Sequence, residues 1–230
     1  MKIGADIPDQ RIMELMYKQK PGMCCTLIYT SGTTGYPAYD HAVTEEEMFK
    51  DDPAEVYYGY GWSRRYTEIL GNFASKKSDL KVAICRPTGV YGSYDDFDPS
   101  TSHVIPALIK RAIDKENPYV VWGSGEEIRD FLHVKDLVRG CLLLLEKNAN
   151  SDPVNIGSGK EYKIKEIVKT ILNLTDNKNT KIEFDNTKPT TIPVRKVNVE
   201  KAKKILGFEM KISLEEGLKE TINWYKSNIK

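Results

Sequence analysis

Short apolar runs alternate along the chain with segments in which apolar residues recur at helical spacing. Residues 26–31 and 81–87 are two apolar runs of strand length, and Pro87 closes the second because proline cannot extend a hydrogen-bonded ladder. Residues 60–75, between them, have helical character. This alternation predicts a layered α/β domain with buried strands, and the loop that leaves residue 31 is a favoured place for a ligand.

Two further helices are predicted in the C-terminal half. Between residues 164 and 172, apolar side chains recur at i, i+3, i+4, i+7 and i+8, which gives one core-facing stripe. Ser213 and Glu216 form a capping box in front of an apolar helical face. We therefore expect the last segment to dock as a helix.

Composition narrows the class of function. The 230 residues correspond to about one and a half domains at roughly 150 residues each. The 34 Lys and Arg against 33 Asp and Glu give a net charge of +1, and no basic run is present, so we expect no nucleic-acid partner. The longest apolar run, residues 141–145, is far shorter than the roughly 20 residues that span a bilayer, so we expect no membrane partner.

The cysteines and the first residues of the chain indicate the cellular compartment of the protein. The four cysteines have no metal-ligand spacing, so we expect no metal site and reduced thiols. No signal-peptide pattern follows Met1. The expected localisation is cytoplasmic.

One predicted helix carries a candidate acid–base pair. Tyr60 and Arg64 lie four residues apart and therefore share one helical face. A tyrosine hydroxyl titrates near about 10 in model peptides, and a nearby cation favours the phenolate, which suits proton transfer. The same spacing is common on solvated helices, so it indicates chemistry only in company with other motifs.

Such motifs follow in order from residue 33 to the C-terminus. They are Thr33-Thr34-Gly35-Tyr36-Pro37, Arg86-Pro87-Thr88-Gly89-Val90-Tyr91-Gly92, Ser102-His103-Val104-Ile105-Pro106, Val121-Trp122-Gly123-Ser124-Gly125 and Arg129-Asp130-Phe131-Leu132-His133-Val134. Together with the Tyr60 helix, they resemble the extended short-chain dehydrogenase/reductase family, in particular NAD-dependent nucleotide-sugar epimerases and dehydratases and the GDP-fucose synthase group. The resemblance implies a truncated Rossmann-like parallel sheet with helices on its faces, plus a smaller mixed α/β C-terminal substrate lobe.

The resemblance also implies roles for individual residues. Tyr60 would exchange a proton with a sugar hydroxyl or ketone while hydride passes to or from NAD or NADP, and Arg64 stands where the family has a lysine that holds the nicotinamide ribose. His103 matches the acid of the GDP-fucose synthase group, with a structural loop histidine as the alternative. The implied partners are a nucleotide sugar and a second copy of the chain. The implied substrate-binding residues are Thr33, Thr34, Trp122, Arg129 and Arg195.

Two substitutions depart from the family pattern. Gly32 stands where the family has a hydroxyl that bonds the reacting oxygen, and a strand-like backbone would turn the neighbouring Thr33 to another face. Thr34 stands where the GDP-fucose synthase group has a cysteine base, and a threonine hydroxyl cannot do that work. A complete 3,5-epimerase is therefore not expected.

The glycine-rich turn for the dinucleotide is also missing. Residues 123–125 and 157–159 contain paired glycines, but neither follows the start of a βαβ unit. Residues 1–36 instead resemble a stretch of a long-chain acyl-CoA synthetase of the adenylate-forming superfamily. The chain is thus divided into that segment, a Rossmann-like remnant over 26–85 and a nucleotide-sugar part over 86–230.

Three hypotheses follow. The first is an NAD(P)-dependent nucleotide-sugar epimerase, dehydratase or reductase. The second is a catalytically impaired remnant or fusion that binds a nucleotide sugar or a partner subunit. The third is a fragment of an adenylate-forming acyl-CoA ligase. Loss of the first strands would expose a sheet edge and an apolar face, which predicts association or poor solubility. The resemblance implies a homodimer, to which a helix like residues 60–75 would contribute.

Overall fold

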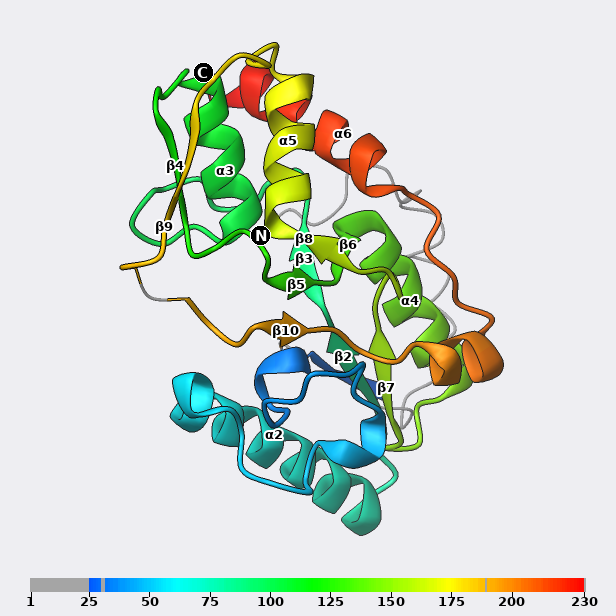
Figure 1. Cartoon of the computed structure of the whole chain (residues 1–230). Helices are drawn as coiled ribbons and strands as arrows, with labels where there is room; N and C mark the ends of the chain where they lie inside the picture. Colours follow the sequence, from blue (N-terminus) through cyan, green and yellow to red (C-terminus); the bar gives the residue numbers. More distant parts are fainter. Residues whose placement is uncertain (1–24, 30–31, 189, 230) are drawn as a thin grey trace.

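A parallel three-stranded sheet forms the base of the protein in a computed structural model that describes residues 25–29, 32–188 and 190–229 (Figure 1). Its order is β1 (Cys25–Tyr29), β2 (Lys81–Pro87) and β7 (Pro153–Ile156). β2 lies in the centre and pairs in parallel with both neighbours. The predicted strand over 81–87 is confirmed, and so is the expected α/β class with a parallel sheet.

Helices cover the two faces of this sheet. Ala83 and Cys85 of β2 share a core with Leu137 and Leu144 of α4 (Val134–Lys147). Arg86 points to the other face, where it meets α2 (Tyr58–Lys77). Because successive side chains of a strand point to opposite faces, α4 and α2 sandwich β2. Figure 1 shows α2 below the sheet and α4 beside it.

A second group of elements lies at the other end of the molecule. Helices α3 (Val104–Ile113), α5 (Ile164–Leu174) and α6 (Leu214–Asn228) bury one core together with β4 (Tyr119–Trp122). The predicted stripe of α5 faces this core, and the predicted cap of α6 is present: the Ser213 hydroxyl accepts a hydrogen bond from the Glu216 backbone N–H.

Short strands join the two groups, with β10 crossing between them (Figure 1). Among the described residues they form three small sheets, in which β3 pairs with β6, β4 with β9, and β5 with both β8 and β10. The remaining bounds are β3 (Gly89–Tyr91), β5 (Ile128–Arg129), β6 (Phe131–His133), β8 (Tyr162–Lys163), β9 (Ile182–Asp185), β10 (Val194–Arg195), the 3-10 turns η1 (Gly32–Thr34), η2 (Glu45–Glu47) and η3 (Glu55–Tyr57), and the π-helical turn η4 (Ala202–Leu206).

The base sheet extends across the predicted division between residues 26–85 and residues 86–230. β7 and α4 come from residues 86–230 and pack with β1 and β2. The segment 1–36 lies largely outside the described residues. In the part of the chain that the structure describes, every helix is too short or too polar to cross a membrane.

A buried guanidinium holds the base of the molecule together. Arg86, which is 1% exposed, donates from Nε and Nη2 to the Glu68 carboxylate of α2, with a shortest separation of 2.6 Å. Its Nη1 donates to the Tyr36 hydroxyl at 3.0 Å and to the Glu45 carbonyl at 2.8 Å. The Tyr36 hydroxyl in turn donates to Asn155 Oδ1 at 2.7 Å. These bonds join β2, β7, α2 and the loop that follows β1.

Removing one partner of the buried ion pair of Arg86 and Glu68 should lower the stability of the fold. We expect Glu68→Ala to lower the free energy of unfolding by about 3–5 kcal/mol, because it leaves a buried cation without its carboxylate. Urea unfolding at neutral pH measures the loss. The exposed pair of Lys181 and Glu183 is the control, and Glu183→Ala should leave the midpoint unchanged. Equal, small effects of the two substitutions would contradict this account.

Candidate functional site

The predicted acid–base pair lies on the first turns of α2. Arg64 donates a hydrogen bond to the Tyr60 hydroxyl, and its guanidinium carbon lies 4.4 Å from the centroid of the Tyr60 ring. Tyr60 is 47% exposed. Gly61 lets the helix approach the loop after β1, because a Cβ there would lie 2.6 Å from the Thr34 carbonyl oxygen. The structure thus brings a phenol and a fixed cation together beside that loop.

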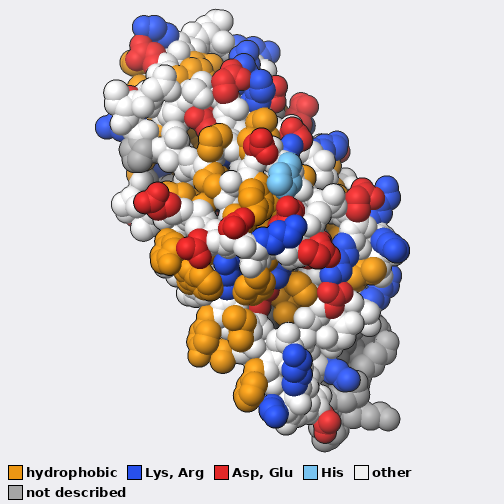
Figure 2. All heavy atoms as spheres, turned by 60° about the horizontal axis from the view of Figure 1, so that its bottom comes forward, with side chains coloured by type: hydrophobic (Ala, Val, Ile, Leu, Met, Phe, Trp, Pro, Cys, Tyr) orange, Lys and Arg blue, Asp and Glu red, His pale blue; other side chains and the backbone are white. Residues whose placement is uncertain are grey.

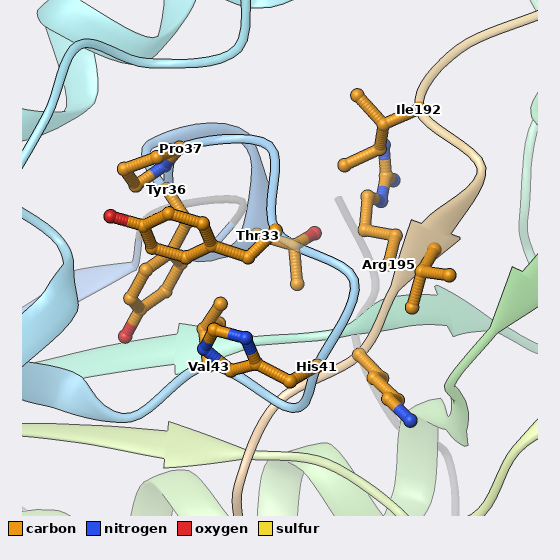
Figure 3. Close-up of a pocket in the computed structure, with 10 residues that line it drawn as sticks. Thr33, Tyr36, Pro37, His41, Val43, Ile192 and Arg195 are labelled. Carbon is orange, nitrogen blue, oxygen red and sulfur yellow. The ribbon is translucent and has the colours of Figure 1, made fainter.

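The loop after β1 departs from the expected strand geometry. Residues 32–34 form the turn η1, so the alternation of side chains along a strand does not apply to Thr33. Thr33 is buried and lines a small cavity of about 10 Å³ opposite Arg195 (Figure 3). Thr34 is also buried but does not line this cavity. The expectation that Thr33 turns to an unrelated face is therefore wrong, since a 3-10 turn has a different side-chain period.

Arg129 and Arg195 are neighbours across the parallel pair of β5 and β10. Arg129 donates to neutral oxygens only: the carbonyls of Ile128 and Pro193 and the Thr191 hydroxyl. Arg195 donates from Nη1 to the Tyr57 hydroxyl at 2.5 Å. Within the described residues, neither guanidinium has a carboxylate within ion-pair distance.

The electrostatics of this pair indicate a site for an anion. Burial, together with repulsion by Arg195, lowers the pKa of Arg129 to about 10. The charges of Tyr57 and Glu127 oppose this lowering, but two adjacent cations with no carboxylate in ion-pair contact favour a bound anion. A guanidinium fork suits bidentate contact with phosphate oxygens. The arrangement can therefore hold a phosphate or diphosphate group.

His103 and Trp122 lie at the ends of their elements. His103 precedes α3, its side chain is 81% exposed, and its Nδ1 lies 3.8 Å from Asp95 Oδ1. Asp95 raises the pKa of this histidine above its ordinary value, against the opposing effects of burial and of the Arg195 charge. Trp122 ends β4 with its indole 57% exposed and has no ring or cation–π partner among the described side chains.

The sequence motifs imply no functional role for Tyr57. It ends η3, is half-buried, and holds Arg195 through its hydroxyl, with the guanidinium carbon 5.3 Å from the ring centroid. Tyr57 lies three residues before Tyr60 in the same motif, and this spacing is the signal that could have drawn attention to it. Its partner is distant in the chain, so the contact itself required the tertiary structure.

Comparison with known proteins now identifies the family. The model of the NAD dependent epimerase/dehydratase family matches residues 9–157, more than half of the chain. The chain belongs to this family. Because the match begins inside the segment 1–36, that segment is part of the epimerase similarity, and nothing found supports the resemblance to acyl-CoA synthetases.

The relatives are enzymes of nucleotide-sugar metabolism. GDP-L-fucose synthase 1 of Arabidopsis thaliana is 38% identical over 147 residues, which cover 62% of this chain and 45% of that protein. dTDP-4-dehydro-6-deoxy-D-allose reductase of Streptomyces bikiniensis is 30% identical over 185 residues, 80% of this chain and 56% of that protein. The chain thus spans about half the length of the curated relatives it matches.

Solved structures show the same fold. The crystal structure of UDP-glucose 4-epimerase from Thermotoga maritima with UDP-glucose superposes with a TM-score of 0.78 and 26% identity. It covers 95% of this chain, which corresponds to 68% of that protein. The Rossmann-like arrangement predicted for this epimerase/dehydratase family member is confirmed.

The residues near Tyr60 fit the nicotinamide end of a dinucleotide. Arg64 Nε is buried and has no hydrogen-bond partner among the described residues, and a ribose hydroxyl is an acceptor that would satisfy it. The paired glycines at 123–125 and 157–159 lead into β5 and β8 rather than into helices, so neither is a dinucleotide turn, as predicted.

The anion site can be tested without knowing the substrate. Pyrophosphate well above its Kd should raise the Tm of the protein by about 5 °C, because a ligand that binds only the folded state stabilises it. Arg195→Gln should remove this shift. Thermal unfolding followed by circular dichroism measures both values.

Lys181→Gln provides the matched control, since it removes an exposed cation that already has a carboxylate partner, Glu183. It should keep the full shift. A shift that survives in Arg195→Gln would mean that pyrophosphate binds elsewhere on the surface.

Proposed function

We propose that this chain is the catalytic and substrate-binding part of an NAD(P)-dependent enzyme acting on a nucleotide sugar. The observation that carries the proposal is the pair Arg129 and Arg195, two adjacent guanidiniums without a carboxylate. The diphosphate of a nucleotide sugar supplies the missing negative charge. The relatives named above act on GDP- and dTDP-linked sugars, which fits this chemistry.

The reaction that we favour is reduction of a keto sugar. Thr34 is a buried hydroxyl at the position of the cysteine base, so the chain lacks a base for epimerisation there. Reduction of a ketone needs a hydride and a proton. The nicotinamide cofactor supplies the hydride when bound, and Tyr60 donates the proton to the carbonyl oxygen.

The neighbouring residues serve that proton transfer. The Arg64 cation, bonded to the Tyr60 hydroxyl, stabilises the phenolate that is left behind. Thr33 faces the cavity beside Arg195 and offers the hydroxyl that Gly32 lacks. His103, which the resemblance makes an acid in epimerisation, has no proton to supply in this reduction and would contact the sugar, and the exposed Trp122 would stack on the nucleotide base.

Substitution of Tyr60 tests the proposed chemistry. Tyr60→Phe should lower kcat for NAD(P)H-dependent reduction of a GDP- or dTDP-linked 4-keto sugar by about 10²–10⁴-fold, because the proton donor is lost. Its affinity for pyrophosphate should be unchanged. Tyr58→Phe, at an exposed position on the same helix and outside the proposed site, is the control and should keep full activity.

The outcome also separates the alternatives. Pyrophosphate binding without turnover in the unmodified protein would favour the impaired remnant over the enzyme. An adenylate-forming ligase is not favoured, because the family match covers the loop on which that hypothesis rested.

We further propose that the protein is a homodimer formed through α2. Tyr66, Ile69, Leu70 and Phe73 recur at i, i+3, i+4 and i+7, and all four side chains are exposed. Figure 2 shows hydrophobic side chains gathered on the face that contains α2. An apolar helical stripe that faces solvent can pair with the same stripe of a second copy about a two-fold axis.

A charge in this stripe should break the dimer. Leu70→Glu is expected to shift the protein from two copies to one in light scattering after size exclusion, since a dimer would bury two carboxylates against apolar surface. Asn173→Glu, which adds the same charge on an exposed position of α5, should leave the mass unchanged. A monomeric unmodified protein would refute the dimer.

We also propose a cytoplasmic location, because the four cysteines have neither the spacing of a disulfide framework nor that of a metal site.

A further inference from the structure

The contact between Tyr57 and Arg195 joins the start of α2 to the arginine pair. Tyr57 is the N-cap of α2, about one helical turn before Tyr60. Its hydroxyl accepts a hydrogen bond from Arg195, which lies 138 positions away in the chain. The guanidinium also lies 5.3 Å from the ring centroid, a cation–π distance. Two interactions of different kinds therefore hold one side chain.

The backbone around Arg195 has little freedom of its own. Its carbonyl accepts a hydrogen bond from the Asp130 N–H at 3.1 Å, and the next carbonyl, of Lys196, accepts one from the Val43 N–H at 3.2 Å. Because hydrogen bonds hold the backbone at Arg195 on one side and at the next residue on the other, the direction of the Arg195 side chain is the main freedom left. Tyr57 provides the hydrogen bond that sets this direction.

The chemistry of the Tyr57 side chain suits that task. A phenol is neutral at physiological pH, so it can accept a hydrogen bond from a guanidinium without cancelling its charge. A carboxylate at this place would form an ion pair and compete with a bound anion. A guanidinium has five N–H donors, and the Tyr57 bond uses one, which leaves others for phosphate oxygens.

We propose that Tyr57 is a positioning residue that holds Arg195 toward the substrate diphosphate while leaving its positive charge uncompensated. This inference rests on the proposed function, and it adds a residue to which neither the motifs nor the relatives assign a role. Tyr57 acts through Arg195 in substrate binding, whereas Tyr60 acts on the reacting carbonyl.

The first test compares neutral and charged replacements of equal size. Tyr57→Gln keeps a neutral acceptor and Tyr57→Glu adds a carboxylate of the same shape. In calorimetric titrations of the full chain with pyrophosphate and with GDP, Tyr57→Gln should bind within a few-fold of the unmodified protein. Tyr57→Glu should bind at least about 10-fold more weakly than Tyr57→Gln, because its charge neutralises Arg195. Equal affinities of the two variants would overturn the proposal.

The second test removes only the hydroxyl. Tyr57→Phe keeps the ring over the guanidinium and should weaken pyrophosphate and GDP binding by about 10-fold, the scale of one hydrogen bond to a charged group. Tyr58→Phe is the matched control on the adjacent residue, whose ring packs on Trp62, and it should change nothing. Circular dichroism melts of both variants check that the fold is intact.

A double-mutant cycle shows whether the effect passes through Arg195. If Tyr57 acts only by holding this arginine, Tyr57→Phe combined with Arg195→Gln should bind no more weakly than Arg195→Gln alone. Losses that add would overturn the proposal, since they would mean that Tyr57 contacts the ligand independently.

Kinetics separate this residue from the catalytic one. Tyr57→Phe should raise KM for a 4-keto nucleotide sugar with kcat unchanged, the signature of lost uniform binding, whereas Tyr60→Phe should lower kcat. If the unmodified protein binds neither pyrophosphate nor GDP, the proposed function itself fails. If the unmodified protein binds them and Tyr57→Phe binds equally well, only the present inference fails.

Discussion

The buried ion pair of Arg86 and Glu68 is the constraint on which the rest of the molecule depends. Burial alone disfavours the charge on Arg86, yet Tyr36 and Glu68 together raise its pKa above the ordinary value, so the side chain stays cationic inside the protein. A buried cation must have its hydrogen bonds made. Those bonds fix α2 against β2 and against the loop after β1, and that loop carries Thr33 while α2 carries Tyr60.

The pair formed by Arg129 and Arg195 differs from this ion pair in its charge balance. Among the described residues, the hydrogen-bond partners of Arg129 and Arg195 are all neutral, and the two adjacent cations repel one another. Arg86 is matched to a carboxylate and stabilises the fold, whereas the Arg129 pair is left unmatched and can bind an anion. The difference lies in the partners, since the side chains are chemically the same.

Local sequence patterns predicted the elements that depend on local physics. The apolar run ending at Pro87 became β2, the apolar stripe after residue 164 became α5, and the cap at Ser213 began α6. The side-chain alternation of a strand, assumed for the loop at Thr33, failed because the chain forms a 3-10 turn there. Turn type depends on what packs against it, here the close approach of α2 at Gly61, which no local pattern records.

The sequence by itself determined the α/β class and the family, because apolar runs and short motifs occur in a fixed order along the chain, and it determined the Tyr60–Arg64 pair through helical spacing. Only the tertiary structure decided that Arg129 faces Arg195 without a counter-charge and that Tyr57 holds Arg195. The physical reason is that these relations come from strand register and from a contact across 138 positions. Such relations arise when separate elements pack, and the chemistry of a charged site depends on them.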